Sequence, residues 1–467
     1  MSSEQPVKSV ITLRSIYSLI KQSLSGAHQD YTIGSIRKAV ILLSVPMILE
    51  MCMESVFAVV DIFFVGRLGK EAVATVALTE SVITLVYSVA IGLSMAATAL
   101  VARRIGEKRP EEAARSAAQA INLALFISLV ISLIGAFAAP GILEIMGAST
   151  ETVEKGASYT RILFGGSVVI MLLYLINGIF RGAGNASIAM WSLWIANGCN
   201  IILCPLLIHY FGIKGAAIAT TTGRGIGVCY QLYHLFRGKG IVRIFRKYFV
   251  PDMELIRSVI KIAWTGTTQF LIGSASWIVM TRIIARFGDG AIAGYQVAIR
   301  IFLFFLLPAW GMSNAAATLV GQNLGAQRPD RAEQSVWTAA KYNSIFMVLV
   351  SLLFIFGSEV IVTFMNKDAE VVAYAVQALR IISLGYIIYG VGMVLTNAFN
   401  GAGDTRTPTL INLFCFWAFQ IPLAYVMAVV MGWGPTGVFV AIPVTESAVT
   451  LSSWLIFRKG KWKKIKI

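Results

Sequence analysis

Three carboxylates within one apolar stretch are the residues of this sequence best suited to chemistry. Glu50, Glu54 and Asp61 lie in the run from Leu43 to Gly69, which is long enough to cross a bilayer. At 100° per residue the three side chains fall within about 40° of one another on a helix, so they form one acidic stripe. An ionised acid at the centre of a bilayer costs about 2.5–3.5 kcal/mol. The stripe must therefore face the interior of a helical bundle or a watery cavity, and it marks a functional site.

A carboxyl group at such a site can take up a proton on one side of a membrane and release it when its surroundings change. We expect this behaviour first of Asp61. Glu54 and Glu50 lie one or more helical turns deeper, and they either attract a cationic compound or share protons with Asp61. The plainer alternatives are a solvated acid near the outer helix end for Asp61, and acids held by polar neighbours for the other two.

A second polar face occurs in the apolar stretch 186–210. Its members follow each other at steps of three or four residues, as one side of a helix requires: Trp194, Asn197, Asn200 and Cys204. We expect Trp194 and Asn197, together with Asn177, to line a substrate site. The structural alternative is that the amides hydrogen-bond to other helices within the bilayer.

The composition is that of a polytopic helical membrane protein. Of 467 residues 57% are hydrophobic and 13% charged, and the mean hydropathy is +0.75. The formal net charge of +16 fits basic cytoplasmic loops rather than nucleic-acid binding. The five cysteines lie in apolar runs without paired spacing, and the sequence has no P-loop or HExxH motif. We therefore expect no resident metal, no cofactor and no enzymatic activity.

Twelve apolar segments are near or above the length that spans a bilayer. They are 39–66, 72–101, 114–138, 156–180, 186–210, 214–236, 256–285, 290–320, 334–356, 371–400, 407–431 and 436–457. With both termini cytoplasmic, the cytoplasmic segments hold 27 Lys and Arg residues and the opposite loops six. This asymmetry predicts that orientation.

Two halves of the chain repeat at an offset of 219 residues. Residues 92–116 and 311–335 are identical at 11 of 25 positions, and Arg181-Gly-Ala-Gly184 corresponds to Asn400-Gly-Ala-Gly403. The acids have no acidic partners: opposite Glu50, Glu54 and Asp61 stand Gln269, Gly273 and Met280. A packing role would more often be duplicated, so this asymmetry favours function. Arg161 and Arg380 are also partners, which indicates a shared structural role, pairing with carbonyls or acids.

The repeat divides the chain into lobes. We expect a cytoplasmic N-terminal segment (1–38), either an interfacial helix or an unstructured tail, a first lobe of six spans (39–237), a cytoplasmic linker (238–255), a second lobe of six spans (256–457) and a basic cytoplasmic tail (458–467). Six spans per half is an even number, so the lobes point the same way and are related by an axis along the membrane normal. Duplicated lobes are typical of transporters.

At this point the chain resembles the multidrug and toxic compound extrusion (MATE) family over residues 35–457. The resemblance rests on Asp61–Gly69 (D-x-x-F-V-G-x-L-G), the L-V-A-R end of the second span, the Gly-Ala-Gly motifs and the twelve-span plan. The acid of the first span resembles the branch often called DinF-like. The resemblance implies an all-α membrane protein, with twelve helices in two pseudo-symmetric six-helix lobes arranged as a V.

The resemblance also implies a cation-coupling site around Asp61. It adds Asn200, Tyr159 and Thr222, and it places Cys204 where relatives usually carry an aspartate. Tyr159 has an alternative role as an anchor at the membrane interface. A sodium ion prefers several hard oxygen ligands, so the thiol weakens a sodium site at Asp61 more than a proton site.

The function we predict is export of organic, chiefly cationic, drugs or toxic compounds by alternating access, in exchange for protons rather than sodium. We expect a monomer in the cell membrane. The first alternative is a flippase for lipid-linked oligosaccharides from the wider superfamily, which would need a more cationic cavity. The second is a membrane-embedded enzyme, for which the sequence shows no catalytic pair.

Overall fold

The computed structural model describes residues 13–26, 29–238 and 240–467, and within these ranges the chain forms helices and no strands. The first half contains α1 (Leu13–Leu24), α2 (Ile36–Gly66), α3 (Lys70–Gly106), α4 (Pro110–Ile145), α5 (Thr150–Gly165), α6 (Ser167–Gly182), α7 (Ala186–Phe211) and α8 (Ile213–Arg237). The second half contains η1 (Arg246–Phe249), α9 (Met253–Ile284), η2 (Ala285–Phe287), α10 (Asp289–Gly325), α11 (Pro329–Met365), α12 (Ala369–Ser383), α13 (Tyr386–Ala402), α14 (Arg406–Asn412), η3 (Leu413–Gln420), α15 (Ile421–Tyr425), η4 (Val426–Val430), α16 (Pro435–Arg458) and η5 (Lys461–Lys464).

The helices supply the twelve expected crossings. Among the described residues nine are long and apolar enough to span a membrane, or ten if the bent pair α12 and α13 is one span. At 31 and 25 residues, α2 and α8 are also long enough. Two crossings are interrupted at repeat-related glycines, Gly166 between α5 and α6 and Gly385 between α12 and α13, the second with a bend of 61°. The predicted fold class is confirmed.

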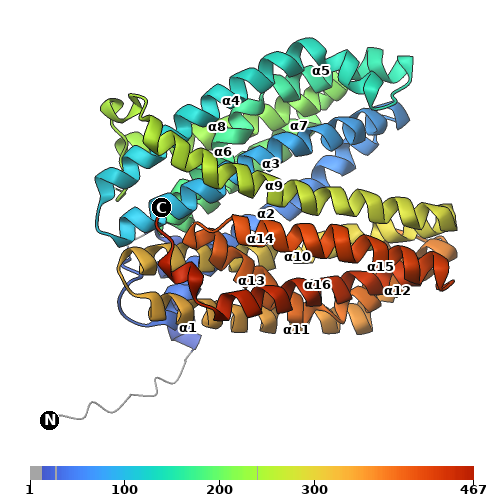
Figure 1. The fold of residues 1–467 in the computed structure, drawn as a ribbon. Coiled ribbons are helices and arrows are strands. Elements are labelled where there is room, and N and C mark those ends of the chain that lie inside the picture. Colours follow the sequence, from blue (N-terminus) through green and yellow to red (C-terminus); the bar gives the residue numbers. More distant parts are fainter. Residues whose placement is uncertain (1–12, 27–28, 239) are drawn as a thin grey trace.

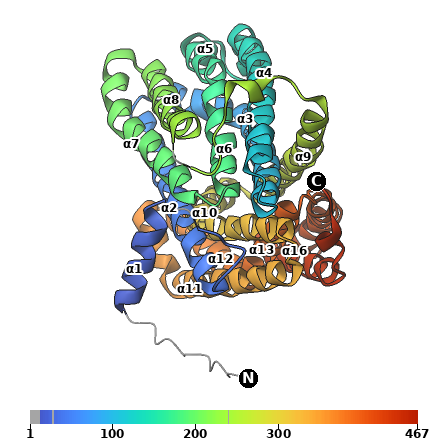
Figure 2. The same cartoon turned by 90° about the vertical axis from the view of Figure 1, so that its left-hand side faces the viewer.

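The chain is folded into two layers of helices (Figure 1). Seen along the bundle, α3–α8 form one layer and α10–α16 the other (Figure 2). The helices α2 and α9 lie near the boundary between the layers, α2 on the left and α9 on the right in this view. The contacts agree, because α2 packs against α7 and α10, and its repeat partner α9 packs against α3. In Figure 1, α4 and α5 rise away from the other layer toward the end opposite the C-terminus.

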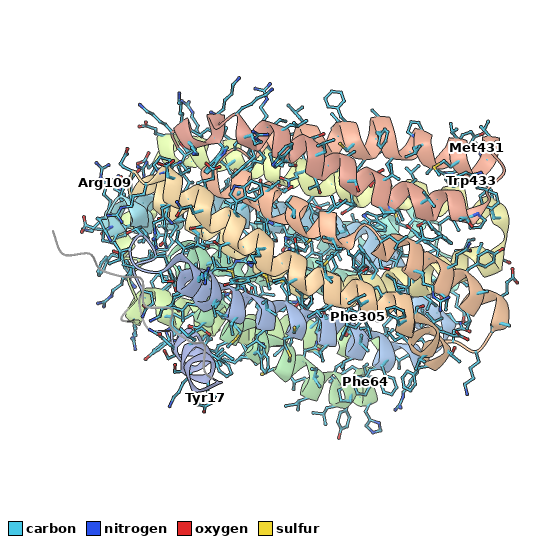
Figure 3. The ribbon with its side chains drawn as sticks, turned by 90° about the horizontal axis from the view of Figure 1, so that it is seen from below. Tyr17, Phe64, Arg109, Phe305, Met431 and Trp433 are labelled. Atoms are coloured by element: carbon cyan, nitrogen blue, oxygen red, sulfur yellow. The ribbon has the colours of Figure 1, made fainter. Side chains whose placement is uncertain are left out.

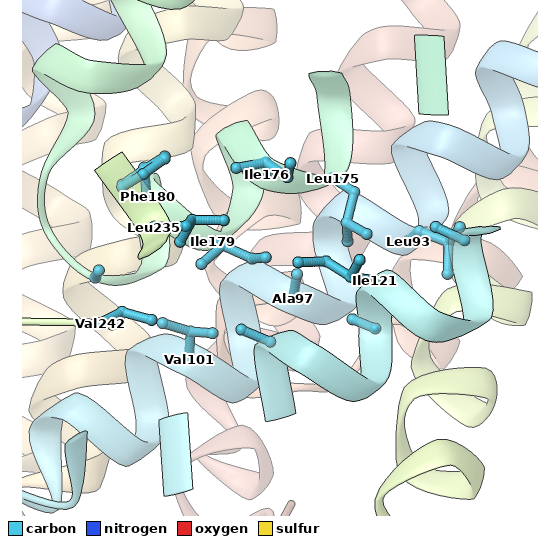
Figure 4. Close-up of a cluster of buried hydrophobic side chains, with 14 of the residues drawn as sticks. Leu93, Ala97, Val101, Ile121, Leu175, Ile176, Ile179, Phe180, Leu235 and Val242 are labelled. Carbon is cyan, nitrogen blue, oxygen red and sulfur yellow. The ribbon is translucent and has the colours of Figure 1, made fainter. Parts of the chain in front are cut away.

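Small residues allow close helix packing in the first lobe. Ala97 of α3, Ile121 of α4 and Ile176 of α6 belong to one buried cluster (Figure 4). Gly178 and Gly182 of α6 press against α3: a Cβ atom on Gly178 would lie 2.5 Å from the Ser94 hydroxyl, and one on Gly182 would lie 2.7 Å from the Thr98 carbonyl oxygen. The absence of a side chain at these two positions therefore lets α6 and α3 approach closely.

The lobes are held together at the end of the molecule where α1 and the C-terminus lie, which is also the end where Arg109 lies in Figure 3, opposite Met431 and Trp433. Across the boundary, Gln322 donates to the Gly182 carbonyl (3.0 Å) and Thr318 to the Arg181 carbonyl (3.0 Å). Arg103 reaches the carbonyl oxygens of Ala402 (3.3 Å) and Ile465 (3.0 Å). This end of the boundary is therefore closed.

The segment that precedes α2 also bridges the lobes. Asp30 pairs with Lys108 of the first lobe, whereas the carbonyls of Thr32 and Ile33 accept from Arg328 (2.7 Å) and Arg331 (2.8 Å) of the second. Upstream lies α1, so this part of the N-terminal segment is helical rather than an unstructured tail. Its Tyr17 projects outward (Figure 3), and residues 1–12 lie outside the described part of the chain.

Candidate functional site

A central cavity of about 420 Å³ lies between the two lobes. The first lobe contributes charged and phenolic side chains to its wall, namely Glu54, Asp61, Glu80, Tyr87, Tyr174, Arg181 and Arg224. The second lobe contributes only neutral lining residues, among them Phe270, Trp310, Asn314, Asn397 and Asn400. The two walls are therefore chemically different, although the repeat makes the backbones alike.

A smaller pocket of about 240 Å³ extends into the first lobe. Asp61, Glu80 and Arg224 line both the cavity and this pocket, and Tyr159 and Thr220 line the pocket alone. An ion that binds at Asp61 can therefore be reached from the central cavity and held inside one lobe. This placement is what a coupling site beside a substrate cavity requires.

Glu50 forms the deepest member of the acidic stripe. It is 1% exposed, accepts a hydrogen bond from Asn177 (3.0 Å) and pairs with Arg181 Nη1 at 3.4 Å. Asn177 in turn accepts from Ser192 (2.9 Å) and Gln231 (2.6 Å). Glu50 does not line the central cavity. Its side chain instead supports Arg181, which does.

Glu54 lines the cavity, and its carboxylate has two hydrogen-bond donors and one arginine as neighbours. Tyr174 donates to its Oε1 and Asn197 to its Oε2, both at 3.0 Å, and Arg224 Nη2 lies 3.6 Å from Oε1. Arg224 is 3% exposed, and its guanidinium lies over the rings of Phe57 (5.5 Å) and Tyr87 (5.3 Å). The Glu54 carboxylate thus has a fixed position and a fixed counter-ion.

Asp61 is the acid of the stripe without such a counter-ion. Among the described residues it forms no ion pair, it is 8% exposed, and its hydrogen-bond partner is the Cys204 thiol, with Sγ 4.0 Å from Oδ1. Glu80 is likewise unpaired within the described residues, but its side chain is exposed to the cavity. Two of the acids are thus neutralised by arginines, and two are available to exchange a cation.

The residues expected around Asp61 divide into two groups. Cys204, Asn200 and Tyr159 are all buried in the first lobe, and Asn200 donates to Thr220 Oγ1 (2.9 Å) while its own Oδ1 has no partner among the described residues. Tyr159 lines the inner pocket, so it is not an interfacial anchor. Thr222, by contrast, is exposed. The threonine that faces the pocket is Thr220.

The placement of Thr222 has a simple physical reason. Thr220 and Arg224 are four residues apart, and they share the face of α8 that turns toward the pocket. A residue two positions from each of them is rotated by about 200° and lies on the opposite face. The structure therefore does not bring Thr222 to this site.

Of the three residues of the first lobe expected at the substrate site besides the acids, two lie beside the acids and one lies elsewhere. Asn197 and Asn177 belong to the hydrogen-bond network of the acids, as described above. Trp194 is half-exposed, packs edge-on against Trp191 and donates its Nε1 hydrogen to the Leu49 carbonyl (2.9 Å). It fastens α7 to α2 and is not among the residues that line the cavity. Its expected role in a substrate site is not supported by this position.

From the sequence alone no role is assigned to Arg224, the cation that pairs with Glu54 at the cavity wall. A lone arginine in an apolar segment was the available signal, because such a charge needs a buried acid as its partner. The acid-pairing role considered for Arg161 is not what the structure shows. Arg161 is exposed and donates to the Ala136 carbonyl (2.8 Å), and its repeat partner Arg380 donates to Ser358 (3.2 Å).

Within the described ranges, no group of three or more His, Cys, Asp or Glu side chains could hold a metal ion. The pocket at Asp61 is lined by two carboxylates, Asp61 and Glu80, and by the hydroxyl groups of threonine and tyrosine side chains. Such a set is able to pass a proton, and the direct hydrogen-bond partner of Asp61 is a thiol rather than a hard oxygen ligand.

Known proteins are similar to this chain over more than nine-tenths of its length. A model of the MatE family matches twice, at residues 46–206 and 267–426, once in each half. The probable multidrug resistance protein YoeA of Bacillus subtilis (strain 168) is 25% identical over 444 residues, which cover 93% of this chain and 96% of that protein. The probable multidrug resistance protein NorM of Thermotoga maritima is 24% identical over 455 residues, which cover 96% of this chain and 97% of that protein.

Solved structures are similar in the same way. A crystal structure of MATE in complex with MaL6 has a TM-score of 0.89 and 25% identity, and covers 94% of this chain and 100% of that one. A multidrug resistance MATE family transporter in an outward-facing conformation has a TM-score of 0.87 and 25% identity, with 93% and 98% covered.

Proposed function

This chain belongs to the MatE family, and we propose that it is a cation-coupled antiporter that exports organic cations across the cell membrane. Its relatives in this family are transporters and not enzymes, and the chain itself is a multi-pass membrane transporter. The partners we propose are small organic cations and other xenobiotics. We also propose that both termini of the chain lie in the cytoplasm. The excess of Lys and Arg on that side supports this orientation.

The observation that carries the proposal is the position of Asp61. This carboxylate lies where the central cavity meets the inner pocket, without an arginine partner among the described residues. A cation at Asp61 is therefore in reach of the same cavity that admits a substrate. Cation binding and substrate binding can then oppose each other through one set of side chains.

The charge balance of the site favours cationic substrates. Four acids, Glu50, Glu54, Asp61 and Glu80, face two arginines, Arg181 and Arg224, so the fully ionised site keeps an excess of negative charge. A positively charged compound is attracted to such a wall. A flippase would have to hold a pyrophosphate there, and the acids outnumber the arginines that could bind it.

In the cycle we propose, the lobes first open toward the outside, while the end near α1 and the C-terminus stays closed. A proton reaches Asp61 and removes the charge that holds the substrate in the cavity, so the substrate leaves outward. The lobes then rock, the closed end opens, and a new substrate displaces the proton. Thermodynamic linkage requires that the proton weakens substrate binding and that the substrate weakens proton binding, both by the same factor.

We propose protons rather than sodium because of Cys204. The thiol next to Asp61 is a poor ligand for a hard cation, whereas a proton needs only the carboxylate. Glu80 is the competing consideration, because it lines the same pocket and would supply a second carboxylate if its side chain turned toward Asp61.

The test is export from proteoliposomes that contain the purified protein and a fluorescent organic cation. A pH gradient alone, acidic on the outer side, should drive export, and a sodium gradient at matched pH should drive it poorly. Export that requires sodium and ignores the pH gradient would assign sodium as the coupling ion. Export that responds to neither gradient would remove the antiport proposal itself.

A further inference from the structure

Helices α3 and α10 form opposite walls of the central cavity, α3 from the first lobe and α10 from the second. Repeat partners line the cavity at three successive turns, namely Ile91 and Trp310, Met95 and Asn314, and Thr98 and Ala317. These residues mark the stripe of each helix that faces the other lobe. At the closed end the same two helices touch, where Gly325 presses against Gly106. The cavity therefore lies between two helices that meet at one end.

Toward the outer end, each stripe carries one charged side chain. On α3 the cavity-lining Tyr87 is followed outward by Glu80, which also lines the cavity. On α10 the cavity-lining Leu307 is followed outward by Arg300. In both helices the step is seven residues, which turns a side chain by about 700°, or 20° short of two full turns. Glu80 and Arg300 therefore lie on the facing stripes of the two lobes.

The two charges lie at nearly the same height on their helices. Glu80 is 26 residues from Gly106, and Arg300 is 25 residues from Gly325. At a rise of about 1.5 Å per residue, these separations are about 39 Å and 38 Å along the helix axes. The repeat partners of the two charged residues are an isoleucine and a serine. Each lobe therefore supplies one charge at this height, and the two charges are of opposite sign.

Neither charged side chain has a partner in this structure. Both are exposed, and within the described part of the chain the Glu80 carboxylate and the Arg300 guanidinium form no ion pair and no hydrogen bond. The charges of Arg300 and Arg224 both act on Glu80, but Arg224 is already paired with Glu54. An unpaired arginine within a membrane-spanning helix is too costly to face lipid. Arg300 must therefore face the open mouth of the cavity, toward Glu80.

We propose that Glu80 and Arg300 form the outer gate of the transporter, and that they pair across the lobe boundary when the outer ends of α3 and α10 come together. The gate is open in this structure, and the pair forms in the state whose other end is open. An interaction made in one of two states shifts the equilibrium toward that state. Closure also removes water from the mouth of the cavity, which strengthens the attraction. The inference rests on the alternating access proposed above, and it assigns the residues that close the outer side.

The experiment measures how often the end that is closed in this structure opens, in purified protein in detergent and without any ion gradient. Ala102 is fully buried at that end, and a Cβ atom on Gly321 of the other lobe would lie 2.6 Å from the Ala102 Cβ. In Ala102→Cys protein without the native cysteines, a maleimide therefore reacts while that end is open. Glu80→Lys replaces attraction at the gate by repulsion. It should slow the labelling about three- to tenfold, and Arg300→Glu should do the same.

The double variant Glu80→Lys with Arg300→Glu is the decisive control, because it restores two opposite charges in exchanged positions. Its labelling rate should return to within about twofold of the Ala102→Cys parent. Arg300→Lys, which keeps the positive charge, should slow labelling less than Arg300→Gln. If Glu80→Lys does not fold, Glu80→Gln removes the attraction alone and should slow labelling about two- to fivefold.

Three results would overturn the inference: single variants that label at the parent rate, a double variant that stays as slow as the single ones, or a parent that is never labelled. The second result would mean that each charge acts on its own lobe rather than through the pair. Labelling needs no gradient. A failure of gradient-driven export would therefore contradict the antiport proposal and leave the labelling result standing.

Discussion

Gly106 and Gly325, repeat partners 219 residues apart in the chain, touch each other where α3 and α10 end. A Cβ atom on Gly325 would lie 3.0 Å from the Gly106 Cα and would also collide with the Arg103 carbonyl oxygen. A Cβ atom on Gly106 would collide with the Gln322 carbonyl oxygen. The two helices therefore cross at the pseudo-two-fold axis, with backbone against backbone, and only glycine permits this approach.

Gly106→Ala should accordingly weaken the closure between the lobes and populate the state in which this end is open. The measurement is the rate at which a maleimide labels a cysteine at Ala102, which is fully buried beside this crossing, in protein without the native cysteines. Labelling should become several-fold faster. Gly141→Ala is the control, since a Cβ there meets nothing within 4 Å. Equal labelling in both variants would contradict the role of this crossing.

Asp61→Asn should abolish gradient-driven export and leave the amount of folded protein unchanged. Removing a buried charge relieves its desolvation cost, so no loss of stability is expected. Met280→Asn, at the repeat-related position of the second lobe, should export nearly normally. Transport in proteoliposomes and thermal unfolding in detergent check both variants. Equal loss of export in the two would indicate a packing effect rather than coupling.

Cys204→Asp should shift the transporter toward sodium. The new carboxylate would stand beside Asp61 and add both a charge and a hard oxygen ligand. Export should then respond to a sodium gradient at matched pH. Cys204→Ser, which adds an oxygen without a charge, should keep proton-driven export. The explanation would be wrong if the unmodified protein already exported strongly with sodium alone.

Glu50→Gln should destabilise the first lobe, because it leaves the Arg181 guanidinium without its charged partner. Loss of one member of a buried pair typically costs about 3–5 kcal/mol. The double variant Glu50→Gln with Arg181→Asn has the same two residues as the repeat-related positions of the second lobe, Gln269 and Asn400. It should recover much of that stability. Thermal unfolding in detergent measures both. A single variant as stable as the unmodified protein would show that the pair contributes little.

The orientation can be tested by labelling introduced cysteines in intact cells. Positions Arg109 and Lys463 should be protected from an impermeant reagent, whereas Ala148 and Gly434 should react, on a background cleared of the native cysteines. The physical reason is the excess of Lys and Arg in the loops assigned to the cytoplasm. Reaction at position 463 would reverse the assignment.

The sequence by itself determined the class of protein, the duplicated architecture and the acidic stripe. These features depend on local properties: hydropathy marks each span, the period of 3.6 residues puts Glu50, Glu54 and Asp61 on one face, and a constant offset exposes the repeat. The resemblance to a known family, rather than a local pattern, placed Cys204 beside Asp61. In the structure Cys204 Sγ lies 4.0 Å from Asp61 Oδ1.

The tertiary structure alone decided which partners these residues have. Glu50 meets Arg181 and Glu54 meets Arg224, each more than a hundred residues away in the chain, and such pairs depend on how each helix is rotated and how deep it lies. An error of two residues in register turns a side chain by about 200°, which is why Thr220 rather than Thr222 faces the pocket. Packing between helices sets that rotation, and it is absent from any one segment read alone.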